Sequence, residues 1–181
     1  MIDRVFIALP ISGHLLAELR SKTVAKQSQT TGWRWARPDI WHITVRWLGT
    51  LSDDQAARLA QYCHELSAKI TAPMNVEITS LELYPSERRP QTLSFIVGLN
   101  EQMLRLWSEA RDWCYQEGIG ASDRKGFKPH ISVARFPKGM KIHFLSERMK
   151  ILGELDTLSL FQSELREDGP EYISLTTATF S

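Results

Sequence analysis

Apolar and polar residues alternate along two short stretches of the chain that carry the same phrase. The first stretch reads His42-Ile43-Thr44-Val45, and the second reads His130-Ile131-Ser132-Val133. Alternate side chains of a β-strand point to the same face, so each histidine shares a face with the hydroxyl residue two positions later. The pattern predicts strands over residues 41–48 and 129–136, with their apolar residues turned toward a core.

Elsewhere the apolar spacing changes between the period of a helix and that of a strand. Helical spacing follows Ser12, Ser52 and Asn100, and Ser52 with Gln55 has the form of a capping box. Further strands are predicted over residues 4–9, 74–83, 92–99, 154–165 and 172–180, with a turn at 167–170. Residues 137–150 follow neither period clearly, and we expect them to be partly helical. Mixed helices and adjacent strands predict an α+β fold with antiparallel sheets.

Composition narrows the class of protein. The 181 residues are 43% hydrophobic and 24% charged, as in an ordinary globular protein, and the formal net charge is only +1. A global basic field for sequence-blind nucleic-acid binding is therefore excluded, although a local basic patch is not. The two cysteines, Cys63 and Cys114, lack metal-ligand spacing and are interpreted as buried thiols of a reducing compartment. The apolar run at residues 5–11 is too short to span a membrane.

The doubled phrase has a direct chemical interpretation. Histidine can donate or accept a proton near neutral pH, so two histidines on facing strands can act as acid and base on opposite sides of a phosphorus atom. The two hydroxyls can donate to phosphate oxygens, and no metal is required. The three remaining histidines lack the pattern. The alternatives are packed structural histidines, or a zinc site, for which two histidines are too few ligands.

Three segments resemble one known family. They are residues 4–9, residues 35–49 around the first histidine, and residues 127–135 around the second. With His42 and His130 separated by 88 positions, the chain is similar to the two-histidine (2H) phosphoesterase superfamily. Within it, the chain most resembles the RNA 2′,3′-cyclic phosphodiesterases, also called 2′-5′ RNA ligases.

The resemblance implies roles for individual residues. His42 matches the proton donor to the leaving group, and His130 matches the proton acceptor that activates water. Thr44 matches a phosphate-binding hydroxyl, and Ser132 stands where the family usually has threonine. Arg135 matches an arginine that contacts phosphate. Strict alternation would turn Arg135 away from His130, so this contact requires a bulge, a strand end or a long reach.

The resemblance also implies an RNA-binding cleft beside the histidines. It predicts one bilobal domain over residues 1–181, in which two pseudo-symmetric lobes with antiparallel sheets face a central cleft and carry their helices outside. Arg46 falls on the histidine face if alternation is strict. The candidate RNA or base contacts are Phe6, Trp35, Arg46, Phe127 and Lys128, followed by Trp33, Arg34, Arg37, Arg124 and Lys125.

The function implied is metal-independent hydrolysis of a 2′,3′-cyclic phosphate on RNA or a nucleotide to the 2′-phosphate, with 2′-5′ ligation as the reverse reaction. We expect no cofactor, no membrane partner, a monomer and a cytoplasmic location, with tRNA fragments among the candidate substrates. Two alternatives stay open. One is the same chemistry on a 2′-5′ oligoadenylate or an ADP-ribose cyclic phosphate, and the other is a non-catalytic RNA-binding module.

Overall fold

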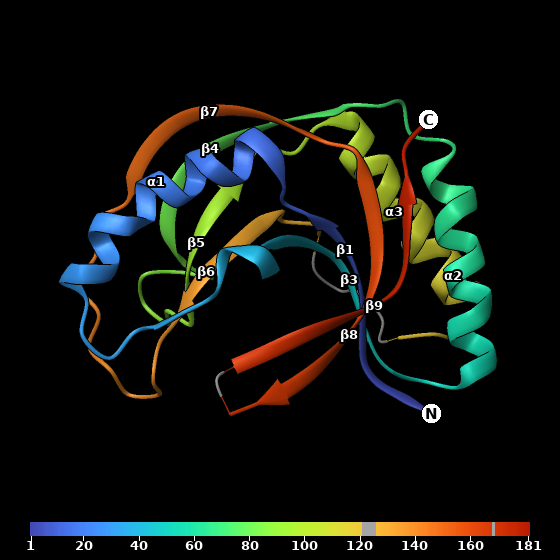
Figure 1. The fold of residues 1–181 in the computed structure, drawn as a ribbon, viewed down its shortest axis with the longest axis horizontal. Helices are drawn as coiled ribbons and strands as arrows, with labels where there is room; N and C mark the ends of the chain where they lie inside the picture. Colours follow the sequence, from blue (N-terminus) through green and yellow to red (C-terminus); the bar gives the residue numbers. More distant parts are fainter. Residues whose placement is uncertain (121–125, 168) are drawn as a thin grey trace.

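The strands of the protein form one curved antiparallel sheet (Figure 1). A computed structural model describes residues 1–120, 126–167 and 169–181. Within these residues the sheet has nine strands in the order β7-β4-β5-β6-β3-β1-β8-β9, and β2 pairs with β6 beside this path. The strands are β1 (Ile2–Pro10), β2 (Arg34–Trp35), β3 (His42–Leu51), β4 (Met74–Tyr84), β5 (Thr92–Val97), β6 (His130–Arg135), β7 (Glu147–Leu155), β8 (Thr157–Arg166) and β9 (Gly169–Thr179).

The sheet consists of two halves that meet at the two histidine strands. One half is β7-β4-β5-β6 and the other is β3-β1-β8-β9, so β6 and β3 lie at the centre. They are joined through a single residue pair, Ile43 with Ile131. The α+β class and the antiparallel pairing are confirmed, and the strands of both halves belong to one continuous open sheet.

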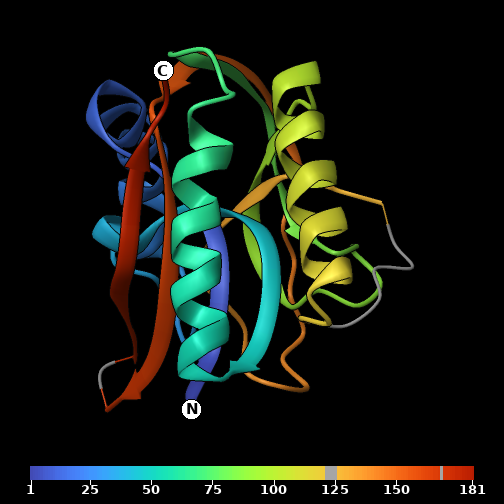
Figure 2. The ribbon, with the colours of Figure 1, turned by 90° about the vertical axis from the view of Figure 1, so that its right-hand side faces the viewer.

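Helices cover the side of the sheet that carries the core. The helices are α1 (Gly13–Gln29), α2 (Asp53–Ser67) and α3 (Glu101–Gln116), with a short 3₁₀ turn at Pro38–Ile40. Helix α1 contacts β7, and Gly153 of that strand permits the approach, because a Cβ there would lie 2.8 Å from the Leu15 side chain. Helices α2 and α3 lie side by side over the other half (Figure 2).

Two of the predicted helix starts are built as the sequence indicates. Ser52 accepts a hydrogen bond from the Gln55 backbone N–H at 3.1 Å, and the Gln55 side chain accepts from the Ser52 N–H at 2.9 Å. Asn100 accepts from the Met103 N–H at 2.8 Å. These caps satisfy N–H groups that have no partner within the helix, so α2 and α3 begin where predicted.

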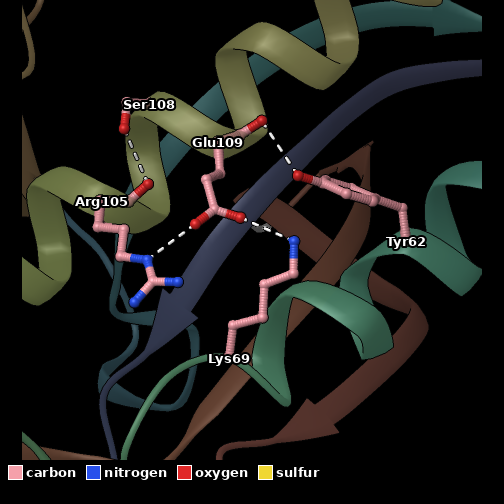
Figure 3. Close-up of polar contacts among 5 residues, drawn as sticks. All are labelled: Tyr62, Lys69, Arg105, Ser108 and Glu109. Carbon is pink, nitrogen blue, oxygen red and sulfur yellow. Dashed lines mark hydrogen bonds and ion pairs between the residues drawn. The ribbon is translucent and has the colours of Figure 1, made fainter.

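A polar cluster joins α2 to α3 (Figure 3). Glu109 of α3 accepts hydrogen bonds from Arg105 at 2.8 Å and from Lys69, beyond the end of α2, at 3.0 Å. The Tyr62 hydroxyl donates to the Glu109 carbonyl at 3.1 Å, and the Ser108 hydroxyl donates to the Arg105 carbonyl at 3.0 Å. The Arg105 hydrogen bond, followed by Lys69, holds the Glu109 pKa below its usual value against the opposing effect of burial. The cluster therefore links the two helices through partly exposed polar contacts.

The C-terminal third departs from the sequence prediction. Residues 137–146 are irregular and no helix forms there, and the strand predicted over 154–165 is two strands, β7 and β8, interrupted at Asp156. Strand β7 escaped prediction because Glu147, Arg148 and Lys150 obscure its apolar period. Both cysteines are buried, as expected. No helix among the described residues has the length and apolar content to cross a membrane.

Candidate active site

The histidine strands β3 and β6 bring the predicted catalytic side chains onto one face. Ile43 and Ile131 pair with each other and are fully buried on the core side. Their neighbours in sequence therefore point to the opposite face. An antiparallel register through this pair sets each histidine beside the hydroxyl residue of the other strand. The four side chains gathered in this way are His42, Thr44, His130 and Ser132.

Both imidazole rings are held by the same contact. His42 Nδ1 lies 2.8 Å from the Ile40 carbonyl oxygen, and His130 Nδ1 lies 2.8 Å from the Lys128 carbonyl oxygen. A carbonyl only accepts, so each Nδ1 carries the proton and donates it. In the neutral ring Nε2 is then the basic nitrogen, and His42 Nε2 lies 3.1 Å from Thr44 Oγ1.

The surroundings of both histidines favour the neutral ring. Burial lowers the pKa of His42; the Ile40 carbonyl opposes this effect, and the charges of His130 and Arg135 add to it. Burial also lowers the pKa of His130, against the effect of the Lys128 carbonyl. A bound anion between the rings would raise both pKa values, because a negative charge stabilises an imidazolium.

A β-bulge in β6 turns Arg135 toward the histidines. Ser94 of β5 pairs with Ser132, but the preceding Leu93 pairs with Ala134, so Val133 is an extra residue. Thr92, on the same face of β5 as Ser94, pairs with Arg135. The parity change that a phosphate contact by Arg135 requires is thus present.

A second bulge, at the corresponding position of β3, overturns the prediction that Arg46 shares the histidine face. Ala8 of β1 pairs with Thr44 and Ile7 pairs with Arg46, so Val45 is the extra residue. Arg46 therefore lies on the face opposite Thr44 and is only 5% exposed. The expectation that it shares the histidine face and contacts RNA is wrong, because alternation is broken at Val45.

Trp47 occupies the position that strict alternation gave to Arg46. It pairs with Phe6 of β1 and is 54% exposed on the histidine face. Phe6 stacks on Trp47 with ring centroids 5.6 Å apart and lies 5.1 Å from the His42 ring. Phe6 itself is 1% exposed, so the predicted contact of Phe6 with RNA is not available; it supports Trp47 and His42 from below.

Two tyrosines complete the surroundings of the histidines. The Tyr84 ring of β4 stacks on His130 with centroids 3.8 Å apart, and the Tyr172 ring of β9 meets His42 at 5.1 Å in an edge arrangement. Sequence reasoning missed both because they come from strands far away in the chain. No local pattern marks them.

A cavity of about 220 Å³ opens beside His42. Tyr172 and Phe161 of the β8–β9 hairpin line it together with Arg37 and Ile40. A larger hollow of about 400 Å³, near Phe144 and Leu145, contains none of the candidate catalytic side chains. Of the candidate catalytic side chains, His42 is the one that lines the smaller cavity.

Known proteins resemble the chain in sequence, over a part that includes the first histidine strand. Residues 10–93, which include the first histidine strand, match the family described as "LigT like Phosphoesterase". The RNA 2′,3′-cyclic phosphodiesterase of Aquifex aeolicus is 26% identical over 149 residues, which cover 77% of each chain. The enzyme of the same name from Bacillus subtilis is 24% identical over 142 residues, 77% of this chain and 76% of its own. Over these stretches the chain is similar to the LigT-like phosphoesterases and to enzymes named RNA 2′,3′-cyclic phosphodiesterase.

Solved structures share the whole fold of this protein. The crystal structure of TT0787 of Thermus thermophilus has a TM-score of 0.82 at 24% identity and covers 98% of this chain and 97% of its own. E. coli LigT complexed with 3′-AMP has a TM-score of 0.73 at 18% identity, covering 100% and 99%. Likeness at this identity establishes the fold that positions the two histidine strands.

The remaining predicted RNA contacts are distributed unevenly over the LigT-like fold. Trp35 faces away from the histidines, packs against the core while only partly buried, and donates its Nε1–H to Thr30 at 3.0 Å; its contact with RNA stays a prediction. Phe127 stacks on Trp107 of α3, with centroids 5.7 Å apart, instead of joining the histidines. Lys128 is exposed, and its carbonyl holds His130.

Three further predicted RNA contacts, Trp33, Arg34 and Arg37, have defined neighbours in the structure. Trp33 stacks on Trp35. Arg37 lines the cavity beside His42 and pairs with Asp39 at 3.5 Å. Arg34 lies directly opposite Arg135. The predicted contacts Arg124 and Lys125 lie outside the described residues. Among the residues that the structure does describe, no three His, Cys, Asp or Glu side chains group as metal ligands would.

Proposed function

We propose that this protein is a LigT-like phosphoesterase that opens a 2′,3′-cyclic phosphate at the end of RNA or of a nucleotide and releases the 2′-phosphate. The observation that carries the proposal is the pair of Nδ1-anchored imidazoles, whose Nε2 atoms share one face with two hydroxyls and a guanidinium. Binding alone needs only donors and cations, whereas paired proton acceptors serve a reaction. The names of the Aquifex and Bacillus relatives agree with this activity.

The reaction assigns one proton transfer to each strand. His130 Nε2 accepts a proton from water as the water oxygen attacks phosphorus and forms the new P–O bond. The bond from phosphorus to O3′ breaks on the opposite side, and His42 Nε2 donates a proton to O3′. This assignment of acid and base follows the family resemblance. Each transfer contributes roughly 10²–10⁴-fold to the rate.

A bound phosphate creates the condition under which His42 can act as an acid, although it raises the pKa of His130 as well. The neutral His42 of the ligand-free protein must gain a proton before it can act as an acid, and a bound phosphate anion raises its pKa in that direction. Thr44 and Ser132 can donate to the non-bridging oxygens, where charge grows in the transition state. Arg135 supplies a two-pronged donor for the same oxygens.

Recognition of the nucleoside would use the exposed aromatic surface. Trp47 offers an exposed ring that stacks on Phe6, which also contacts the His42 ring, and base stacking on such a surface needs no particular base. A ribose 5′-hydroxyl in the place of water would give a 2′-5′ linkage with the same groups, which is the ligation reaction. We also propose that the protein acts as a monomer in the cytoplasm, where its buried thiols stay reduced.

Hydrolysis of a 2′,3′-cyclic nucleotide in the presence of EDTA tests the proposal. We expect wild type to form the 2′-phosphate and His42→Ala and His130→Ala each to lose roughly 10²–10⁴-fold in kcat. His14→Ala is the matched control, since its side chain is 88% exposed on α1, and it should stay at the wild-type rate. Full activity in either active-site variant would falsify the two-histidine mechanism. Activity abolished by EDTA would point to a metal site instead.

A panel of substrates separates the alternatives. Faster cleavage of a 2′-5′ oligoadenylate or an ADP-ribose cyclic phosphate would replace the proposed substrate and keep the chemistry. Binding of RNA without turnover, unchanged in affinity by His130→Ala, would leave a binding module.

A further inference from the structure

Two arginines face each other across the edge of the histidine face. Arg34 of β2 pairs directly with Arg135 of β6 in an antiparallel ladder. Side chains of directly opposed residues point to the same side, so Arg34 shares the face that Arg135 reaches through its bulge. The neighbouring residues confirm this orientation. Trp33 meets Phe136 on the other side, with centroids 4.7 Å apart.

The direct pairing of Arg34 with Arg135 is electrostatically unfavourable when no anion is bound. Directly opposed residues have Cβ atoms about 5 Å apart, and like charges in such a pair are destabilising. Within the described residues neither guanidinium forms an ion pair, whereas Arg37, three positions after Arg34, pairs with Asp39. Glu82, on the same face beside Ser94, accepts a hydrogen bond from Ser80 at 2.5 Å and pairs with neither arginine. An anionic ligand would remove the repulsion between Arg34 and Arg135.

The two arginines differ in their distance from the reacting phosphate. Arg135 lies on the strand of His130, and its charge is felt at His42. Arg34 lies one strand further out, on the short edge strand β2, and is exposed. A phosphate held between the histidines therefore engages Arg135 first, and Arg34 is placed for a second negative group on the same ligand.

We propose that Arg34 binds the internucleotide phosphate next to the cyclic end. The natural substrate is then an RNA chain of at least two nucleotides, and a free cyclic nucleotide is the poorer substrate. The inference rests on the proposed function and names its substrate class. It makes β2 a part of the site that the two histidine strands do not supply.

The test compares a 2′,3′-cyclic mononucleotide with a dinucleotide that ends in the same cyclic phosphate. We expect Arg34→Gln to lower kcat/KM about 10-fold for the dinucleotide and to leave the mononucleotide within about 2-fold, because only the longer substrate loses a charged hydrogen bond. Arg34→Lys should restore part of the loss. Arg20→Gln, an exposed arginine on α1, is the matched control and should change neither substrate.

Salt dependence gives a second readout. Loss of one phosphate contact on a single strand should make the plot of log kcat/KM against log salt for the dinucleotide shallower by about 0.7. Equal losses on both substrates, or no loss on the dinucleotide, would overturn the inference while leaving the proposed function intact. Failure of wild type to hydrolyse either substrate would instead reject the proposed function.

Discussion

Strands β3 and β6 share one local structure, a histidine anchored to a carbonyl and followed by a bulge, but they present different side chains to the site. Each begins with a histidine whose Nδ1 donates to the carbonyl two residues earlier, and each has a bulge between the hydroxyl residue and the fifth residue after the histidine. At that fifth position β3 carries Trp47 and β6 carries Arg135. One half of the sheet therefore offers a stacking surface, and the other offers a positive charge.

In both strands the bulge matters as much as the histidine for which side chains reach the histidine face. In a regular strand the fifth residue after the histidine would point into the core, and the fourth would face the ligand. The extra residue reverses this order. It buries Arg46 and Ala134 and delivers Trp47 and Arg135 to the histidine face.

Loss of the Arg135 charge should lower activity more than loss of the Trp47 ring. We expect Arg135→Gln to lower kcat by roughly 10²–10³-fold, because transition-state charge on the phosphate oxygens loses a donor. Arg135→Lys should recover only part, since an ammonium lacks the two-pronged geometry. Steady-state kinetics on a cyclic nucleotide measure both. An unchanged kcat with a raised KM would show that Arg135 binds substrate without acting on the transition state.

Removal of the Trp47 ring should weaken substrate binding. Trp47→Leu is expected to lower kcat/KM by roughly 10- to 100-fold, which corresponds to about 1–3 kcal/mol of base stacking. Trp47→Phe should retain most of the activity. A ribose 2′,3′-cyclic phosphate without a base serves as the control, and on it wild type and Trp47→Leu should be equal. A loss of the same size on this baseless substrate would refute the stacking role.

The pH dependence tests how the two histidines share protons. Burial lowers the pKa of both rings, so kcat/KM, which reports the free enzyme, should be highest below the ordinary histidine pKa of about 6.5 and should fall toward pH 8 as His42 loses its proton. The kcat profile should extend to higher pH, because bound phosphate raises the His42 pKa. Identical profiles for kcat and kcat/KM would contradict this account.

The smallest effect should come from a site far from both strands. Glu109→Gln removes the acceptor that joins Lys69 and Arg105 and should cost about 0.5–1 kcal/mol of stability at neutral pH, as for a partly exposed ion pair. Because the folded pKa of Glu109 is lowered, its contribution is complete above the unfolded pKa and is lost as pH falls through the folded pKa. Denaturant unfolding at pH 7 and at low pH measures the difference, and kcat should not change. A lower kcat would couple the helix pair to catalysis.

Much of the site could be predicted from local sequence, and the rest depends on long-range pairing. The doubled phrase located both histidines and both hydroxyls, and local capping chemistry located the starts of α2 and α3. The Arg46 prediction failed because a bulge depends on the partner strand, and nothing in residues 42–47 marks it. One signal was available in the second phrase, because the predicted role of Arg135 requires a bulge in that strand. A bulge at the same position of the first strand would place Trp47, and not Arg46, on the histidine face.

Tyr84, Tyr172 and the continuous sheet lay beyond sequence reasoning for a related reason. Both tyrosines reach the histidines from strands remote in the chain, so no spacing relates them to the phrase. The joining of the two halves rests on one pair of buried isoleucines, which have the same apolar pattern as any core strand.

We propose that the two histidine strands perform opposite proton transfers. The most direct test gives His42→Ala and His130→Ala a phosphodiester whose leaving group, 4-nitrophenolate, departs without a proton. We predict that His42→Ala recovers most of its lost rate on this substrate relative to a 2′,3′-cyclic nucleotide, whereas His130→Ala stays impaired because water still needs a base. Equal impairment of the two variants on the activated substrate, or recovery of His130→Ala alone, would contradict the account.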